Sequence, residues 1–132
     1  MVGVVWFVQV VHYPLFEKVG RESFLAYHAG HSSRTSLVVV VPMIVELVSS
    51  IWLAIDPPLS ASGNPLTGLA VAGAVLAAVT WILTFAGAVP AHSRMEAGFD
   101  PSAHRSLMRS HLARTLVWTG HAVVVVGLLA GV

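Results

Sequence analysis

The chain has 132 residues, of which 56% are hydrophobic and 10% are charged, with a formal net charge of +1 and no cysteine. A soluble domain carries about 25% charged residues, so this composition excludes a water-soluble globule and a disordered chain. It also excludes a nucleic-acid binder with a basic stripe and any disulfide framework or thiolate site. We therefore expect an integral membrane protein whose partner is the lipid bilayer, with no nucleic acid bound.

The predicted fold is an all-α membrane four-helix bundle, a single transmembrane domain over residues 1–132. Residues 36–55, 66–89 and 112–132 form apolar runs that reach the roughly 20 residues a helix needs to cross a bilayer. An apolar run at residues 1–16 would extend only about 24 Å as a helix. No basic segment or small-residue cleavage site accompanies it, so a membrane helix is favoured over a signal peptide. We expect that helix to be short or to lack its outer end, as after a start codon assigned too late.

The basic residues predict the orientation of the bundle. All seven lie in two connectors, residues 17–35 and 92–115, and the connector at residues 56–65 has none. The positive-inside rule then makes the two basic connectors cytoplasmic, with both termini outside the cell inner (cytoplasmic) membrane. We expect these connectors to be short amphipathic segments, the second starting a helix with Asp100 as its cap and Pro101 at its first position.

A weak internal repeat relates the two halves of the chain. An offset of 80 residues places His12 on His92, His31 on His111 and Arg34 on Arg114. Duplication and chance both remain open as explanations. A duplication would produce two parallel helical hairpins, related by an axis along the membrane normal, and would bring four histidines to one depth.

These four histidines, His12, His31, His92 and His111, are the predicted metal ligands. Histidine is the commonest metal ligand, and imidazole suits iron, copper and haem, which are the cofactors that we consider. The alternative is that each is an interfacial side chain bonded to lipid phosphate or to a carbonyl.

Three further residues are candidates for cofactor binding. The repeat pairs His28 with Met108, and both side chains can ligate a metal. His121 lies about as deep in the last span as Glu46 lies in the second, and we expect the two to pair. A charged side chain at the bilayer centre costs roughly 2.5–3.5 kcal/mol or more, so such groups usually have a partner.

The predicted catalytic residues are Glu46, Arg34 and Arg114. Glu46 would act as a proton acceptor or as a further ligand, unless it is protonated and donates to a carbonyl. Arg34 and Arg114 each begin a span close to a histidine, and would orient an anionic or carbonyl-bearing substrate. The alternative for both arginines is an anchoring contact with lipid phosphate.

Two stretches, Pro90-Ala-His92 and His111-Leu-Ala-Arg114-Thr115, resemble the anthrone-oxygenase-like family of small four-span bacterial membrane proteins. The resemblance implies an oxygenase-like or unassigned membrane role, and it carries over only His92, His111, Arg114 and Thr115 as site residues. His92 and His111 stand where members of that family often have Asn.

Two functional hypotheses follow. In the first, a cytoplasmic-side histidine cluster binds a redox metal or haem, and the protein is an oxidoreductase that acts on a hydrophobic small molecule. In the second, the protein is a non-catalytic accessory or assembly subunit of a larger electron-transfer or photosynthetic membrane complex. A homo-oligomer is a further expectation, and the sequence leaves open whether the protein is an enzyme.

Overall fold

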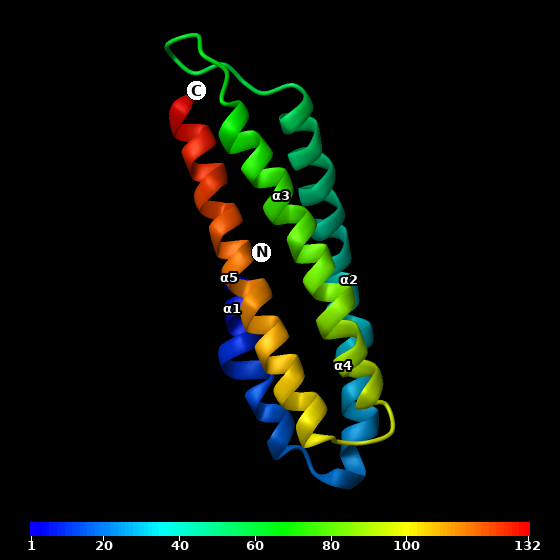
Figure 1. Ribbon diagram of the computed structural model, residues 1–132. Helices are drawn as coiled ribbons and strands as arrows, with labels where there is room; N and C mark the ends of the chain where they lie inside the picture. The colour runs from blue at the N-terminus through cyan, green and yellow to red at the C-terminus, as the bar shows by residue number, and fades with distance from the viewer.

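A computed structural model describes residues 1–132, and its regular secondary structure is all helical, with no strand. The elements in chain order are α1 (Val2–Phe7), the π-helical turn η1 (Val8–His12), the 3₁₀ turn η2 (Pro14–Lys18), α2 (Arg21–Ile55), α3 (Thr67–Leu83), the π-helical turn η3 (Thr84–Ala88), α4 (Val89–Arg94) and α5 (Pro101–Gly131). Figure 1 shows α2, α5 and the helix formed by α3, η3 and α4 side by side in an elongated bundle. The predicted all-α fold is confirmed.

Three helices are long and apolar enough to cross a membrane: Arg21–Ile55, Thr67–Arg94 and Pro101–Gly131. Large apolar side chains point away from the bundle along these helices, and Leu37, Ile55 and Leu129 are each 70% exposed or more. Contiguous exposed apolar surface on this scale suits lipid and not water. The helices and their surface are consistent with a membrane protein.

The first helical segment is interrupted and ends partway along the bundle. The N-terminus lies near mid-height, so α1 accompanies only part of α5 (Figure 1). Pro14 has no N–H with which to continue the α-helical ladder. Tyr13 N–H instead donates to the Val8 carbonyl at 2.9 Å, and Phe16 N–H donates to the Tyr13 carbonyl at 3.1 Å. The predicted span at residues 1–16 therefore changes helix type twice, at the level where the histidines lie.

The prediction of separate short connectors is wrong for most of their length. Helix α2 begins at Arg21 and α5 begins at Pro101, so residues 21–35 and 101–115 continue directly into the long helices. The break before α2 is at Val19, which is extended with ψ 126°. No proline lies between Arg21 and Pro42, so the helix that begins at Arg21 continues without a break into the predicted span. Both helices thus extend well beyond the spans that hydropathy predicts.

The start of α5 matches its prediction. The Asp100 carboxylate accepts from Ser102 N–H at 2.7 Å and from Arg94 Nη2 at 2.7 Å, and Pro101 takes the first position. The Ser102 hydroxyl also donates to Asp100 at 2.7 Å. These hydrogen bonds, that of the Ser102 hydroxyl foremost, lower the pKa of Asp100 to about 2. Asp100 therefore caps α5 as an anion.

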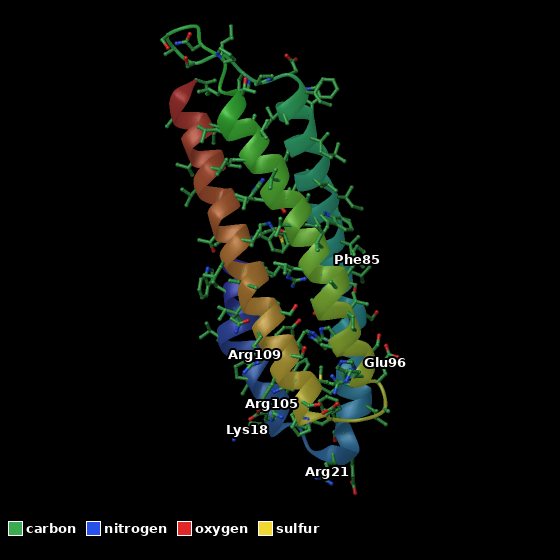
Figure 2. The ribbon with its side chains drawn as sticks, in the orientation of Figure 1. Lys18, Arg21, Phe85, Glu96, Arg105 and Arg109 are labelled. Atoms are coloured by element: carbon green, nitrogen blue, oxygen red, sulfur yellow. The ribbon has the colours of Figure 1, made fainter.

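Two buried clusters hold the bundle together. One end of the bundle carries Lys18, Arg21, Arg105 and Arg109 (Figure 2), and we call it the basic end. The cluster at this end contains Tyr13, Phe16, Phe24, Ala88, Ala91, Met95, Ala103 and Leu107. The other contains Val5, Val39, Met43 and Trp118. Small residues on α3, among them Gly73 and Ala77, are buried and let both α2 and α5 pack closely against α3. The basic-end cluster surrounds the histidines and fixes their positions.

Candidate functional site

Four histidines form two hydrogen-bonded pairs at the basic end of the bundle. His12 Nε2 and His31 Nδ1 are 2.7 Å apart, and His28 Nε2 and His92 Nδ1 are 3.0 Å apart. The rings of His31 and His92 stack with their centroids 5.6 Å apart, which brings the two pairs together. The cluster joins η1, α2 and α4. It brings together three of the four histidines that were predicted to share one site: His12, His31 and His92.

Tyr13 is the buried centre of this cluster, and the sequence analysis missed it. Its hydroxyl lies 3.1 Å from His92 Nε2, and its ring centroid lies 5.7 Å from that of His31 and 4.7 Å from that of His111. In a neutral His92, Nε2 accepts from Tyr13 while Nδ1 donates to His28, so one tautomer satisfies both contacts. The only signal in the sequence was its position directly after His12.

His111, the fourth predicted ligand, is fully buried behind Tyr13. Its Nδ1 donates to Gln9 Oε1 at 2.9 Å, and its Nε2 has no hydrogen-bond partner. A neutral imidazole that donates through Nδ1 presents Nε2 as an acceptor. His111 therefore offers a free acceptor within the cluster and bonds to none of the other histidines.

A cavity of about 420 Å³ lies beside the cluster, between α2 and the helix formed by α3, η3 and α4. Its lining residues are Tyr13, His31, Ser32, Thr35, Ser36, Val39, Val40, Met43, Trp81, Thr84, Phe85, Ala88, Val89, His92, Ser93, Glu96 and Arg114. The residues from α2 recur every three or four positions, as do those from α3, η3 and α4, so each helix contributes one face. Tyr13 and Arg114 come from the two remaining segments.

The lining of this cavity changes from polar to apolar along the bundle. Its α2 face is polar at residues 31–36 and apolar at residues 39–43. On the facing side, His92 lies near the end of α4 and Glu96 lies in the turn that follows α4. Phe85 is 60% exposed and Val40 is 44% exposed, so apolar side chains border its opening. In Figure 2, Glu96 lies nearer the basic end than Phe85 does. The cavity is therefore amphipathic, with its apolar part toward the centre of the bundle.

Arg114 lies within the cavity lining and is only 6% exposed. Its Nη1 donates to Thr84 Oγ1 at 3.1 Å, its guanidinium carbon lies 5.8 Å from the Trp118 ring centroid, and its Nε has no partner. Arg34, the matching residue in the proposed repeat, is exposed and borders a different surface groove beside His12. Only one of the two predicted substrate-orienting arginines thus reaches this cavity.

Both π-helical turns adjoin the site. Turn η1 carries Gln9 and His12, and η3 begins at Thr84 and precedes Pro90, which has no N–H for the helical ladder. A π-turn inserts one residue, which rotates everything after it by about 100° relative to a regular helix. The turns therefore help to determine which side chains face the cavity.

Glu46 and His121 form a second polar cluster further along the bundle. His121 Nδ1 lies 3.1 Å from Glu46 Oε1, which confirms the predicted pair, and its Nε2 lies 3.0 Å from Ser50 Oγ. Trp118 Nε1 also donates to Glu46 Oε1. Neither Glu46 nor His121 lines the cavity beside the histidine pairs. This carboxylate is therefore well placed to hold α2 against α5.

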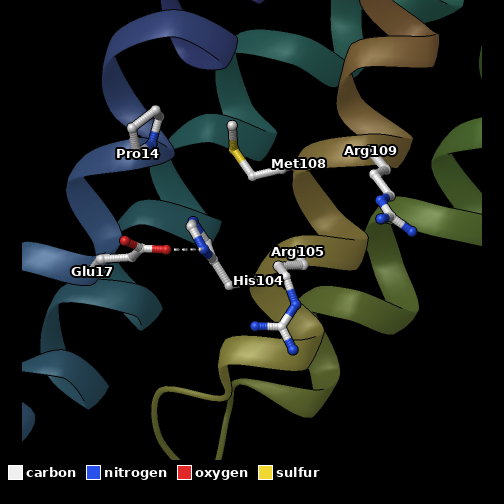
Figure 3. A pocket seen from close by; sticks show the side chains of 6 residues that line it. All are labelled: Pro14, Glu17, His104, Arg105, Met108 and Arg109. Carbon is white, nitrogen blue, oxygen red and sulfur yellow. Dashed lines mark ion pairs between the residues drawn. The ribbon is translucent and has the colours of Figure 1, made fainter.

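The remaining cofactor candidates are separated. His28 bonds to His92, while Met108 borders a surface depression with Pro14, Glu17, His104 and two arginines. Figure 3 shows Glu17 facing His104 in this depression, and their ion pair is 3.2 Å long. His121 is bound in the Glu46 cluster. The predicted set of His28, Met108 and His121 therefore forms no common site.

No group of three or more His, Asp or Glu side chains is arranged to hold a metal ion. The paired histidines point ring nitrogens at each other, and His111 bonds to Gln9. A zinc, copper or iron site needs several ligands converging on one point. The arrangement of these side chains does not fit such a site, and metal or haem binding stays a prediction from the sequence.

Comparisons with family models, with curated proteins and with solved structures gave no match to this chain. The resemblance to anthrone-oxygenase-like proteins therefore stays a prediction, carried by the His92 and His111 stretches alone.

Proposed function

We propose that this chain is an integral membrane protein that binds a lipophilic small molecule in the cavity between α2 and the α3–η3–α4 helix. The observation that carries the proposal is the location of unsatisfied polar atoms. Three buried side-chain atoms have no hydrogen-bond partner: Ser32 Oγ, His111 Nε2 and Arg114 Nε. Ser32 and Arg114 line the cavity, and His111 packs on Tyr13, which also lines it. Since about 90% or more of buried polar groups are paired, a polar ligand head beside them accounts for this concentration.

The shape and lining of the cavity support a ligand that enters from lipid. Its apolar part is bordered by Val40 and Phe85, whose exposed side chains would meet acyl chains. Its polar part lies against His31 and His92. A molecule with an apolar tail and a polar head satisfies both parts, because each then meets a surface of its own kind.

The histidine cluster gives this site acid–base groups. Tyr13, His92 and His28 form a continuous chain of hydrogen bonds that starts in the cavity lining. Groups of this kind supply and accept the protons that oxidation or reduction of a carbonyl or hydroxyl compound requires. An oxidoreductase acting on a hydrophobic substrate is therefore the reaction class that we propose.

We further propose a four-span arrangement in the inner membrane, with the first helical segment as a short fourth member. Lys18, Arg21, Arg105 and Arg109 lie at the same end of the bundle, and the C-terminus lies at the other (Figure 2). The positive-inside rule then supports a cytoplasmic basic end and termini directed outward. We also propose an internal duplication of the chain. It is supported by the four histidines that the repeat relates, whose rings all lie next to that of Tyr13: His12, His31, His92 and His111.

Two neighbouring serines provide the test. Ser32 lines the cavity and its hydroxyl has no partner, whereas Ser33 is exposed and lies outside the lining. Ser32→Phe should fill the cavity, and Ser33→Phe is the matched control. Binding is measured in phosphatidylcholine nanodiscs as quenching of Trp81, which lines the cavity, by dibromostearic acid and its methyl ester.

Binding in the cavity is taken as the part of the quenching that is lost in Trp81→Phe. The other tryptophans do not line the cavity, so their quenching reports contact with lipid outside it. We expect saturable quenching in the wild type and in Ser33→Phe, and at least a tenfold weaker effect in Ser32→Phe. Equal quenching in both serine variants, or none that saturates in the wild type, would contradict the proposal.

A further inference from the structure

We infer that the ligand head is an anion, a carboxylate- or phosphate-like group, and that Arg114 binds it. This inference rests on the proposed function and names the chemical class of the molecule in the cavity. It starts from a property that Arg114 does not share with the other basic residues. Among the Lys and Arg side chains, Arg114 alone is buried.

The charge of Arg114 has no partner of opposite sign within the protein. The ion pairs of the structure join Arg94 to Asp100, His104 to Glu17 and His121 to Glu46, and Arg114 takes part in none. Its contacts are one neutral hydroxyl, that of Thr84, and the face of Trp118. A buried charge is strongly unfavourable unless it is both paired and hydrogen-bonded. An anion in the cavity would supply the missing pair.

The groups around Arg114 suit an oxyanion. The guanidinium carries five N–H donors, and one of them, Nε, is buried without an acceptor. The hydroxyl of Ser32, which has no partner within the protein, belongs to the same cavity lining and can donate as well. A planar guanidinium recognises carboxylate and phosphate oxygens through two parallel hydrogen bonds. The donor set therefore matches a head with at least two anionic oxygens.

One carboxylate of the chain also lines this cavity. Glu96 is exposed and lies toward the basic end, and it makes no ion pair with Arg114. Glu96 therefore does not compensate the buried charge of Arg114. An anion with a short head and an apolar tail would reach Arg114 while its tail contacts Val39 and Phe85.

Two sources offer this chemistry: a free fatty acid, and an anionic membrane lipid with a phosphate head. Both join anionic oxygens to an acyl tail, so both fit the donor set and the apolar opening. The experiment therefore uses both as probes. They are dibromostearic acid with its methyl ester, and dibromo-acyl phosphatidylglycerol with the zwitterionic phosphatidylcholine of the same chains.

The proposed repeat supplies a matched control for Arg114. Arg34 occupies the same place in the His-x-x-Arg-Thr sequence but is exposed and lies outside the cavity. Arg114→Gln removes the buried charge, Arg114→Lys retains it, and Arg34→Gln removes an equivalent charge elsewhere. Retention of the charge in Arg114→Lys keeps the test decisive if Arg114→Gln folds poorly.

The readout is the Trp81-dependent quenching in nanodiscs described above. In the wild type and in Arg34→Gln, we expect at least one acidic probe to bind about ten- to a hundredfold more tightly than its uncharged or zwitterionic counterpart, since hydrogen bonds to a charged group are worth about 1.5–3 kcal/mol. Arg114→Gln should abolish that preference, and Arg114→Lys should retain part of it. The fatty acid and phosphatidylglycerol arms identify which source binds.

Equal binding of charged and uncharged probes in the wild type would overturn the inference and leave the proposed cavity standing. A preference that persists in Arg114→Gln, or that disappears equally in Arg34→Gln, would also overturn it. Failure of every probe to quench Trp81 would instead count against the proposed function itself, so the two failures can be told apart.

Discussion

Arg114 of α5 donates from Nη1 to Thr84 Oγ1 of η3 at 3.1 Å, so the only buried guanidinium of the bundle is held by the first residue of a π-helical turn. This hydrogen bond links η3 to α5 at the cavity, which both residues line. The position of the charge therefore depends on the irregular backbone of the third helix.

Thr84→Val removes the only hydrogen-bond acceptor of Arg114 while keeping the shape of the side chain. Because the buried guanidinium loses a partner, the free energy of unfolding should fall by about 1.5–3 kcal/mol. The measurement is reversible unfolding by dodecyl sulfate in mixed micelles. Thr80→Val is the control, since the Thr80 hydroxyl donates only to Leu76 within its own helix. Equal losses in the two variants would show that the contact with Arg114 contributes nothing.

Gly87→Ala should destabilise the bundle by about 1–3 kcal/mol through overpacking. A Cβ at Gly87 would overlap Ser110 Oγ and lie 2.8 Å from Ser110 Cβ, so α5 would have to move away from η3. Ser110→Gly should restore part of the lost stability in the double variant. Gly30→Ala in α2 is the control, because nothing lies within 4 Å of its added Cβ. Unfolding of all four variants in mixed micelles checks this, and an unaffected Gly87→Ala would contradict the observed close contact.

His121→Phe should cost more stability than Glu46→Gln. The first change leaves the Glu46 carboxylate and the Ser50 hydroxyl without their histidine partner, and leaving a buried polar group unsatisfied costs about 1–3 kcal/mol. The second removes the charge but keeps an oxygen that can accept from Trp118. Unfolding of the two single variants and the double variant gives their coupling energy. A smaller loss in His121→Phe than in Glu46→Gln would argue that the contact with His121 does not stabilise the bundle.

The first turn of α5 should loosen only in strong acid. The pKa of Asp100 is lowered to about 2 in the folded protein from an ordinary value of 3.8. The cap therefore contributes its full stabilisation above about pH 4 and loses it as the pH falls through about 2. Amide proton exchange at Ser102, which donates to Asp100, should accelerate across that range. Asp100→Asn should show no such step, and acceleration at the same pH in this variant would assign the effect to another group.

Much of the fold and part of the site can be predicted from residue type and spacing. Apolar runs locate the three long helices, the shared direction of two spans predicts the Glu46–His121 pair, and the Asp100–Pro101 sequence predicts the start of α5. Each of these depends on local chemistry, or on one contact whose energy demands a partner. The extra length of α2 escaped prediction because hydropathy marks where lipid begins and not where a helix begins.

The cavity could not be predicted in the same way. Its position depends on two π-helical turns, and each shifts the following side chains by one residue relative to a regular helix. No periodic pattern places Tyr13, Thr84 and Ser32 around one space, since they come from three separate segments. The histidine spacing suggested a metal site, whereas the folded chain joins the rings in pairs.

Diffraction from crystals soaked with dibromostearic acid would show where the ligand binds, because the bromine atoms can be located by their anomalous signal. We expect bromine density between α2 and the α3–η3–α4 helix, near Val39 and Phe85, with the carboxylate within hydrogen-bond distance of Arg114. Crystals of Arg114→Gln soaked in the same way should lack the bromine density in the cavity. Bromine found only on the outer, lipid-facing surface of the bundle, or a carboxylate bound away from Arg114, would contradict this expectation.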